Sequence, residues 1–261
     1  MYLQSSTYLE KSVDPAFPSL NTLIESINSQ QSCFLINKDG QSVVNIAFHK
    51  NADPVRVVVR RSNYRQTYQL FSQKTKKTMS CESLIEFNGC YILENIPAIK
   101  SYQMQPAIIH YVIEGVVHRH IPDVLVELKN HTKFFIEFKA ETQLDDEVLI
   151  ARTEVLSNNL PSHGYGYLVV CDAQVSGIHL SNAKQLFHSQ KNKIPKVLLM
   201  EIKHQFDIAP TIAIGNLIKI LKKESHIKHY LYQLMQEGVI GYDSNQLITE
   251  HSEIYWVGSV K

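Results

Sequence analysis

The chain has 261 residues and a mass of 29.9 kDa. Its 44% hydrophobic residues, 20% charged residues and mean hydropathy of −0.15 exclude intrinsic disorder and fibrous architectures. No apolar run approaches the ~18 residues of a membrane span, and the first residues lack the basic start and apolar core of a secretory signal. We therefore expect a folded cytoplasmic protein with no membrane partner.

Charge is distributed unevenly along the chain, although the net charge is only +1. Residues 50–77 contain eight basic residues and a single acid, Asp53. Such a segment is typical of a surface that contacts the phosphate backbone of nucleic acid, and a solvated surface strand is the alternative. The candidate DNA-binding residues are Arg60, Arg61, Arg65, Lys74, Lys76 and Lys77.

The N-terminal part predicts one helix followed by β-structure. A short helix is expected from Ser19 to Ile27, with Ser19 as its N-cap. Turn signals at Asp39-Gly40 and Asp53-Pro54 separate three β-rich runs. These runs cover residues 33–36, 43–48 and 55–59, and they predict a small antiparallel unit.

The central part predicts a helix, a series of strands and then alternation of helix and strand. Glu114-Gly115 is expected to form a hairpin turn. The predicted helices cover 83–93, 144–156 and 181–190, and the predicted strands cover 99–105, 108–113, 116–117, 124–128, 134–138, 165–170 and 197–200. Hairpins followed by helix–strand alternation indicate an α/β domain built on a mixed sheet with flanking helices.

The last fifty residues predict a separate helical module. Helices are expected over 211–221 and 226–236, the second ending at Gly238, and a two-stranded ribbon over 246–249 and 254–257. This order is typical of a winged-helix module. Pro210 is the best candidate for the domain boundary.

One group of residues forms a candidate catalytic site. Pro122-Asp123 begins a predicted strand, and Glu137-Phe138-Lys139 ends the next one. A short turn brings Asp123 beside the end of the second strand, and alternation places Glu137 and Lys139 on one face with Phe138 pointing into the core. Two carboxylates and the Phe138 backbone carbonyl suit Mg²⁺, and Lys139 would lie beside a metal-bound water. The pattern indicates metal-assisted phosphodiester hydrolysis, while a turn residue and a surface ion pair are the structural alternatives.

A third acid that would help to hold the metal is expected on the helix that precedes these strands. Glu86 is the candidate, with Glu82 and Glu94 as competitors that the sequence does not separate. A solvated helix residue is the alternative role for Glu86.

At these residues the sequence resembles the PD-(D/E)xK nuclease superfamily and, within it, the TnsA-type endonuclease subunit of heteromeric transposases. The resemblance covers about residues 60–205 and follows the order of basic segment, acidic helix, Gln105-Pro106, Pro122-Asp123 and catalytic hairpin. It implies a restriction-endonuclease-like fold and an active site of Glu86, Asp123, Glu137 and Lys139. The resulting domain division is a β-rich extension (1–60), a nuclease domain (61–207) and a winged-helix-like domain (208–261).

The resemblance also implies a reaction and partners. The reaction is a Mg²⁺-dependent cut at the 5′ ends of a transposon, with Mn²⁺ as a substitute metal and bacterial nucleoid DNA as the place of action. A TnsB-type transposase would cut and join the 3′ ends, and a TnsC-type ATPase regulator would contact residues 208–261.

Several alternatives stay open. A catalytically silent DNA-binding or scaffolding subunit would retain the fold, and a restriction-type nuclease would act alone on DNA. His118 and His120 share one strand face and suggest zinc, but no further ligand has the usual spacing. Four irregularly spaced cysteines lack a C-x-x-C pair, so Cys171 is expected to be a buried thiol rather than a nucleophile.

Overall fold

The structure is a computed structural model that describes residues 19–29, 44–48, 54, 66–189, 193–221 and 226–258. The chain divides into two compact units, the first comprising residues 1–93 and 98–175 and the second comprising 94–97 and 176–261. The predicted boundary after residue 60 lies outside the described residues, and the one after residue 207 lies within the second unit. In the described part of the chain, no helix has the length and apolar character needed to cross a membrane.

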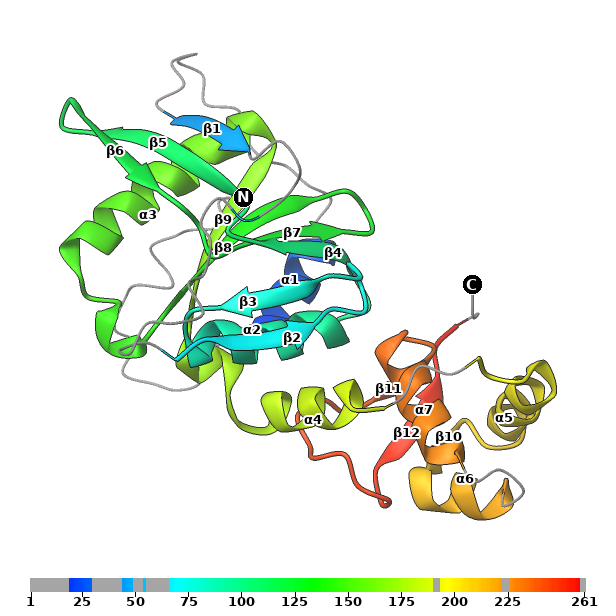
Figure 1. Cartoon of the computed structure of the whole chain (residues 1–261). Helices are drawn as coiled ribbons and strands as arrows, with labels where there is room; N and C mark the ends of the chain where they lie inside the picture. Colours follow the sequence, from blue (N-terminus) through cyan, green and yellow to red (C-terminus); the bar gives the residue numbers. More distant parts are fainter. Residues whose placement is uncertain are drawn as a thin grey trace. The chain divides into compact units, whose positions relative to one another are not determined.

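The centre of the first unit is a four-stranded mixed sheet (Figure 1). Its strands, in spatial order, are β4 (Ile99–Met104), β7 (Val124–Leu128), β8 (Lys133–Lys139) and β9 (Tyr165–Cys171). β4, β7 and β8 pair antiparallel, whereas β8 and β9 pair parallel because helix α3 (Glu147–Asn159) connects them. This mixed α/β architecture confirms the predicted restriction-endonuclease-like fold class.

The first unit also contains two smaller sheets and the N-terminal helix. β1 (Val44–Phe48), β5 (Ala107–Ile113) and β6 (Val116–His120) form one sheet, and β2 (Tyr68–Phe71) pairs with β3 (Thr78–Cys81). The predicted Glu114-Gly115 turn is confirmed, with φ of 50° and 77°. The first helix, α1 (Leu20–Ser29), begins as predicted, because the Thr22 amide donates to the Ser19 hydroxyl at 3.2 Å. The predicted strands over 33–36 and 55–59 lie outside the described residues.

The chain passes between the two larger sheets at two corners that touch each other. Gln105, with φ of 44°, leads from β4 to β5, and Ile121-Pro122 leads from β6 back to β7. The Gln105 amide donates to the Asp123 carbonyl at 2.8 Å. Both corners are therefore held at the start of β7.

Helix α2 (Leu84–Asn95) packs behind β8 through a close contact. Phe138 is 5% exposed and points away from the face that carries Glu137 and Lys139. A Cβ added at Gly89 would lie 2.3 Å from the Phe138 ring, so only glycine fits at this position of the helix. The prediction that Phe138 enters the core is confirmed.

The second unit combines helices with a three-stranded antiparallel sheet in the order β10-β12-β11. Its core includes Ile202, Ile214, Leu217 and Leu231. Gly238, with φ of 74°, ends the last helix as predicted. The elements are α4 (Gly177–Phe187), α5 (Lys196–Ile208), β10 (Thr211–Ala213), α6 (Ile214–Ile220), α7 (Ile227–Gln236), β11 (Ile240–Tyr242) and β12 (Glu253–Trp256). The winged-helix assignment stays a prediction.

Three predicted elements of this unit were wrong in type or extent. Residues 197–200 begin helix α5 instead of forming a strand, and the helix predicted from 211 starts only at Ile214, after strand β10. Residues 246–249 are irregular, and β11 pairs with β12 in their place.

Short 3₁₀ helices occur at Glu141–Gln143, Leu160–His163 and Asp172–Val175.

Candidate active site

The hairpin of β7 and β8 brings Asp123 to the end of β8. Val124 pairs with Ile136, so Asp123, one residue earlier, is level with the Glu137-Phe138 step. An Asp123 carboxylate oxygen, Oδ2, accepts a hydrogen bond from the Phe138 amide at 2.7 Å. The structure therefore brings together the residues that the sequence placed at the ends of two neighbouring strands.

Glu137 is the most enclosed acid of the site, with 3% of its surface exposed. Its Oε1 lies 2.7 Å from Lys139 Nζ and 3.2 Å from an Arg152 terminal nitrogen, and its Oε2 lies 3.0 Å from His120 Nε2. Burial alone would raise the pKa of Glu137, but the contacts with His120 and Lys139 lower it to about 2. The carboxylate is therefore ionised at neutral pH.

Asp123 has the opposite electrostatic environment. Burial raises its pKa well above the ordinary value, and the charges of Glu137 and Glu86 raise it further. The Phe138 hydrogen bond and the Lys139 charge offset only part of this rise. Asp123 thus lies in a group of carboxylates whose mutual repulsion the surrounding cations do not cancel.

Glu86 is buried near these acids and also begins helix α2. Its Oε1 accepts from the Ser83 hydroxyl at 2.8 Å and its Oε2 from the Glu82 amide at 2.9 Å, while the Glu86 amide donates to the Ser83 hydroxyl. This reciprocal arrangement resembles a capping box, except that the carboxylate accepts from the Glu82 amide instead of the Ser83 amide. Burial raises the pKa of Glu86, and the Glu137 charge adds to the rise. Of the three acids on this segment, Glu86 has a pKa that responds to the Glu137 charge, whereas Glu82 accepts a 3.3 Å hydrogen bond from Gln105 and Glu94 lies in the last turn of α2.

Sequence reasoning missed Arg152 and Tyr167, and it considered His120 only as a zinc ligand. Arg152 comes from α3 and Tyr167 from β9, and the Tyr167 hydroxyl lies 3.2 Å from His120 Nε2. Arg152 also lies close to Tyr167. The hydroxyl group of Tyr167, within the apolar run 165–170, was the sequence feature that could have indicated a polar contact at this position.

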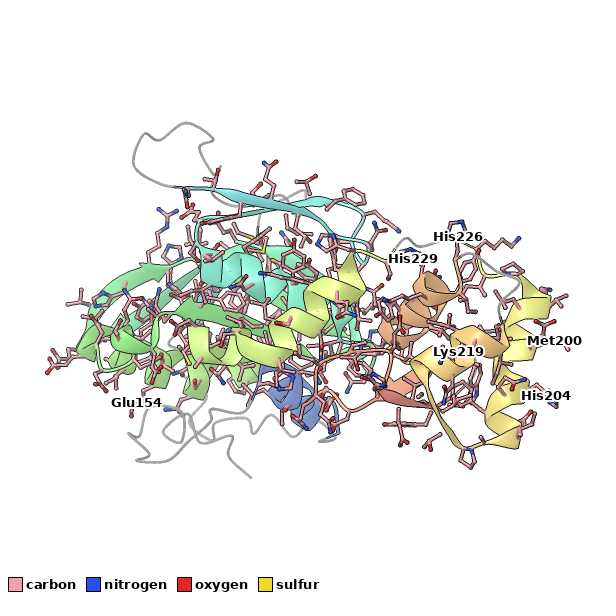
Figure 2. The ribbon with its side chains drawn as sticks, turned by 90° about the horizontal axis from the view of Figure 1, so that it is seen from below. Glu154, Met200, His204, Lys219, His226 and His229 are labelled. Atoms are coloured by element: carbon pink, nitrogen blue, oxygen red, sulfur yellow. The ribbon has the colours of Figure 1, made fainter. Side chains whose placement is uncertain are left out.

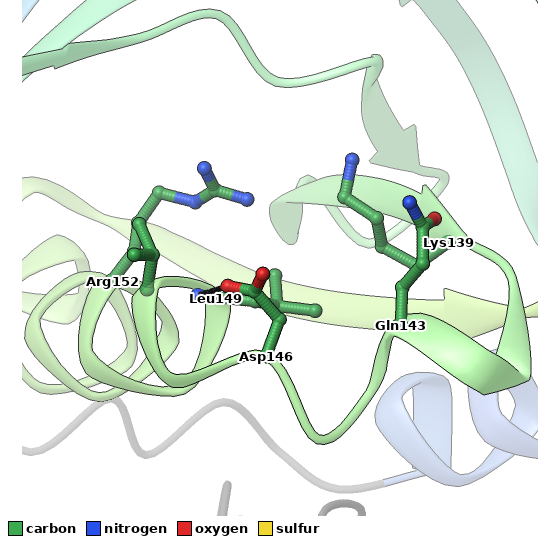
Figure 3. A pocket seen from close by; sticks show the side chains of 6 residues that line it. Lys139, Gln143, Asp146, Leu149 and Arg152 are labelled. Carbon is green, nitrogen blue, oxygen red and sulfur yellow. Dashed lines mark hydrogen bonds between the residues drawn. The ribbon is translucent and has the colours of Figure 1, made fainter.

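A pocket of about 190 Å³ opens beside the Glu137 partners (Figure 3). The Lys139 and Arg152 side chains both reach toward it, and Asp146 caps α3 at its edge by accepting from the Leu149 amide at 2.9 Å. The pocket gives the cationic side of the site access to solvent. Its lining comprises Lys139, Gln143, Asp146, Val148, Leu149 and Arg152.

The donor set fits Mg²⁺ only as a two-carboxylate site. Glu137 Oε2 is buried and makes no hydrogen bond of good geometry with any described residue, so it has room for a further partner. Asp123 supplies a second carboxylate, whereas both Glu86 oxygens are used by the helix cap. Among the described residues, no group of three His, Cys, Asp or Glu side chains is spaced to hold a metal. Mg²⁺ commonly takes one or two carboxylates with waters and phosphate oxygens, which agrees with this set.

The basic segment is only partly described. Lys74 is half-buried and donates to the Ile99 carbonyl at 2.9 Å, which gives it a structural contact. Lys76 donates to Gln73 at 3.1 Å, and Lys77 is exposed. Arg60, Arg61 and Arg65 lie outside the described residues.

The structure does not support the zinc and thiol alternatives within the described part. His118 is exposed and stacks on Tyr111 with ring centroids 5.4 Å apart, whereas His120 is buried against Glu137. Cys171 is buried, and burial raises the pKa of its thiol, which makes it a poor nucleophile.

Comparison with known proteins finds one family model that matches part of the chain. Residues 96–170 match the family model of the TnsA-like endonuclease N-terminal domain, which confirms the resemblance over this range. No curated protein matches the chain. One solved structure, of protein VC1899 from Vibrio cholerae, shares 14% sequence identity at a TM-score of 0.25. That match covers 59% of this chain and 33% of the other, so the chain spans about a third of that protein's length.

Proposed function

We propose that this chain, whose residues 96–170 form a TnsA-like endonuclease N-terminal domain, is a metal-dependent DNA endonuclease subunit of a heteromeric transposase. It would hydrolyse phosphodiester bonds at the 5′ transposon ends, together with a TnsB-type transposase that acts on the 3′ ends. The observation that carries the proposal is the meeting of Asp123, Glu137 and Lys139 at one edge of the sheet inside the matched range.

The residues that would hold the metal are Asp123, Glu137 through Oε2, and the Phe138 carbonyl. Mg²⁺, or Mn²⁺ in its place, would polarise the scissile phosphate and lower the pKa of a bound water. Lys139 is 28% exposed at the pocket mouth, so its ammonium can turn from Glu137 toward a phosphate oxygen or the attacking water. Glu86 would add negative charge without giving up the helix cap.

DNA and protein partners follow from the same assignment. Double-stranded DNA would bind along the basic segment, where Lys77 is the most available described cation. We assign contact with a TnsC-type ATPase regulator to residues 208–261. Helix α7 argues against DNA reading by this module, because it is buried except near its start at Lys228 and His229, which leaves few side chains to contact a DNA groove. Figure 2 shows His226 and His229 at this exposed end.

One observation favours a second candidate function. The Glu137 carboxylate is surrounded by Lys139, Arg152 and His120, an arrangement in which internal cations replace a metal. A catalytically silent DNA-binding or scaffolding subunit would have such a site. A stand-alone restriction-type nuclease is the third candidate, and it differs from the first in needing no partner.

The test is cleavage of a plasmid that carries the transposon ends, with the chain alone and with its transposase, in Mg²⁺ and in EDTA. We expect mapped 5′-end cuts only with both proteins and Mg²⁺, and their loss in Asp123→Asn and Lys139→Met. Lys100→Met, which removes an exposed partner of Glu127, should cut normally. Cutting of plain DNA by the chain alone would favour the stand-alone nuclease. Unchanged cutting in both site variants would favour the silent subunit.

A further inference from the structure

Three side chains outside the predicted motif enclose Glu137, and we call them the Glu137 clamp: His120, Arg152 and Tyr167. They come from β6, α3 and β9, so elements separated in the sequence converge on one carboxylate. Arg152 reaches Oε1 at 3.2 Å, His120 approaches Oε2 at 3.0 Å, and Tyr167 contacts His120 at 3.2 Å and lies close to Arg152.

The two oxygens of Glu137 are not equally occupied. A carboxylate oxygen has two lone pairs. Oε1 has two cationic partners, Lys139 at 2.7 Å and Arg152 at 3.2 Å, whereas Oε2 has His120 nearby and makes no well-formed hydrogen bond. Oε2 is therefore the oxygen with capacity for an additional ligand.

The two cations on Oε1 also differ in how firmly they are held. The Arg152 side chain is 16% exposed and lies close to Tyr167, while Lys139 is 28% exposed and lies at the pocket mouth. When Lys139 turns to substrate, Arg152 still occupies Oε1. The clamp thus keeps the carboxylate plane fixed without depending on the mobile ammonium.

We propose that His120, Arg152 and Tyr167 are positioning residues that hold Glu137 with Oε2 toward a divalent cation. This inference rests on the proposed function and assigns roles to residues outside the Asp, Glu and Lys motif. Partners that orient a metal ligand typically change metal affinity by 10- to 100-fold when they are removed.

The test is calorimetric titration of the full-length chain with Mn²⁺, without DNA or partner protein. Simple electrostatics predicts that loss of the Arg152 charge tightens binding of a divalent cation. Positioning predicts the reverse, so the sign of the change separates the two. We expect Arg152→Met to weaken Mn²⁺ binding about 10- to 100-fold and Arg152→Lys to restore part of it. Tyr167→Phe, which keeps every formal charge, should weaken it about tenfold.

Two controls make the result decisive. Lys100→Met removes a lysine that contacts Glu127 at 2.7 Å on the same sheet, and it should bind Mn²⁺ like wild type. Thermal unfolding in EDTA reports whether each variant is folded, and Tyr167→Phe takes over if Arg152→Met is not. Unchanged or tighter Mn²⁺ binding in the folded clamp variants would overturn the clamp alone. Absence of Mn²⁺ binding by wild type, or equal binding by Glu137→Gln, would instead overturn the proposed metal site.

Discussion

Asp123 is anchored to the strand that carries the other site residues, because its Oδ2 accepts a 2.7 Å hydrogen bond from the Phe138 amide. The contact fixes one oxygen and leaves the other for a ligand. It also holds Asp123 in a buried position close to Glu137, where burial and then the Glu137 charge raise its pKa well above the ordinary value. The site is thus organised for function at the expense of local stability.

Asp123→Asn is expected to stabilise the metal-free protein at neutral pH. An asparagine carbonyl can accept the same Phe138 hydrogen bond without repelling Glu137 and Glu86. Each kcal/mol of relieved repulsion would raise the melting temperature by about 2–4 °C in a protein of this size. Differential scanning calorimetry in EDTA measures the change.

The pH dependence checks this explanation. Because the pKa of Asp123 is raised in the folded state, this group contributes stability to the folded protein at pH values below its unfolded pKa. That contribution is lost as the pH rises through the folded pKa. The gain in stability from Asp123→Asn should therefore decrease as the pH is lowered toward 4. An advantage that is constant with pH would contradict the repulsion argument.

Glu137→Gln is expected to destabilise the protein by about 1–3 kcal/mol, because it leaves Arg152 and Lys139, both half-buried, without their carboxylate. The folded pKa of about 2 lies below the ordinary value, so Glu137 contributes stability above pH 4.5 that is lost as pH falls toward 2. Urea unfolding from pH 7 to pH 3 should show the wild-type advantage decreasing. Lys100→Met, at an exposed ion pair, should cost less than about 1 kcal/mol.

Gly89→Ala is expected to cost about 1–3 kcal/mol, because the added methyl group overlaps the buried Phe138 ring. Alanine ordinarily favours helices, so the sign is opposite to intrinsic propensity. Adding Phe138→Leu should recover part of the loss by making space. If the double variant is no more stable than Gly89→Ala, the ring contact is not the cause.

Variants of the α2 cap should separate its two roles. Ser83→Ala removes the cap hydroxyl and should lower stability by about 1 kcal/mol while DNA cutting persists. Glu86→Gln keeps an acceptor for the Glu82 amide but removes the charge, so it should fold normally and bind Mn²⁺ more weakly. Chemical unfolding and Mn²⁺ titration of both variants measure the two effects, and a Ser83→Ala variant that loses cutting would show that the roles are inseparable.

Lys74 and Lys77 should respond differently to substitution. Lys74→Met removes a hydrogen bond to the Ile99 carbonyl and should lower the melting temperature. Lys77→Met should weaken DNA binding and reduce the slope of log K against log salt by about 0.9 if it neutralises one phosphate. Fluorescence anisotropy at several salt concentrations tests this, and an unchanged slope would remove Lys77 from the DNA surface.

Hydrophobic periodicity and turn-forming residues were sufficient to predict most of the described elements of the first unit. The alternation of side chains along the sequence identified β7 and β8. The spacing from Asp123 to Glu137, with a short turn between the strands, predicted that these two residues lie close together. The run Val197-Leu198-Leu199-Met200 was misassigned because a short apolar segment has the same composition in a strand or a helix. Helix α5 is distinguished only by its extension to Ile208. Met200 on this helix, labelled in Figure 2, is 72% exposed.

The clamp could not be predicted because its members are distant in sequence and individually ordinary. Arg152 resembles a solvated residue of an amphipathic helix until α3 is placed against the sheet. His120 belongs to β6 in one sheet and Tyr167 to β9 in another. Their convergence depends on tertiary arrangement, which one-dimensional spacing does not encode.

The two touching corners at Gln105 and Asp123 have a mechanical consequence. Because the chain leaves the four-stranded sheet at one corner and returns at the other, the β5–β6 hairpin is joined to that sheet beside Asp123. His120 ends β6 and lies 3.0 Å from Glu137 on β8, and Ile109 and Tyr111 of β5 share a hydrophobic core with Phe135 of β8. A shift of the hairpin relative to the four-stranded sheet would therefore change both the His120–Glu137 contact and this core.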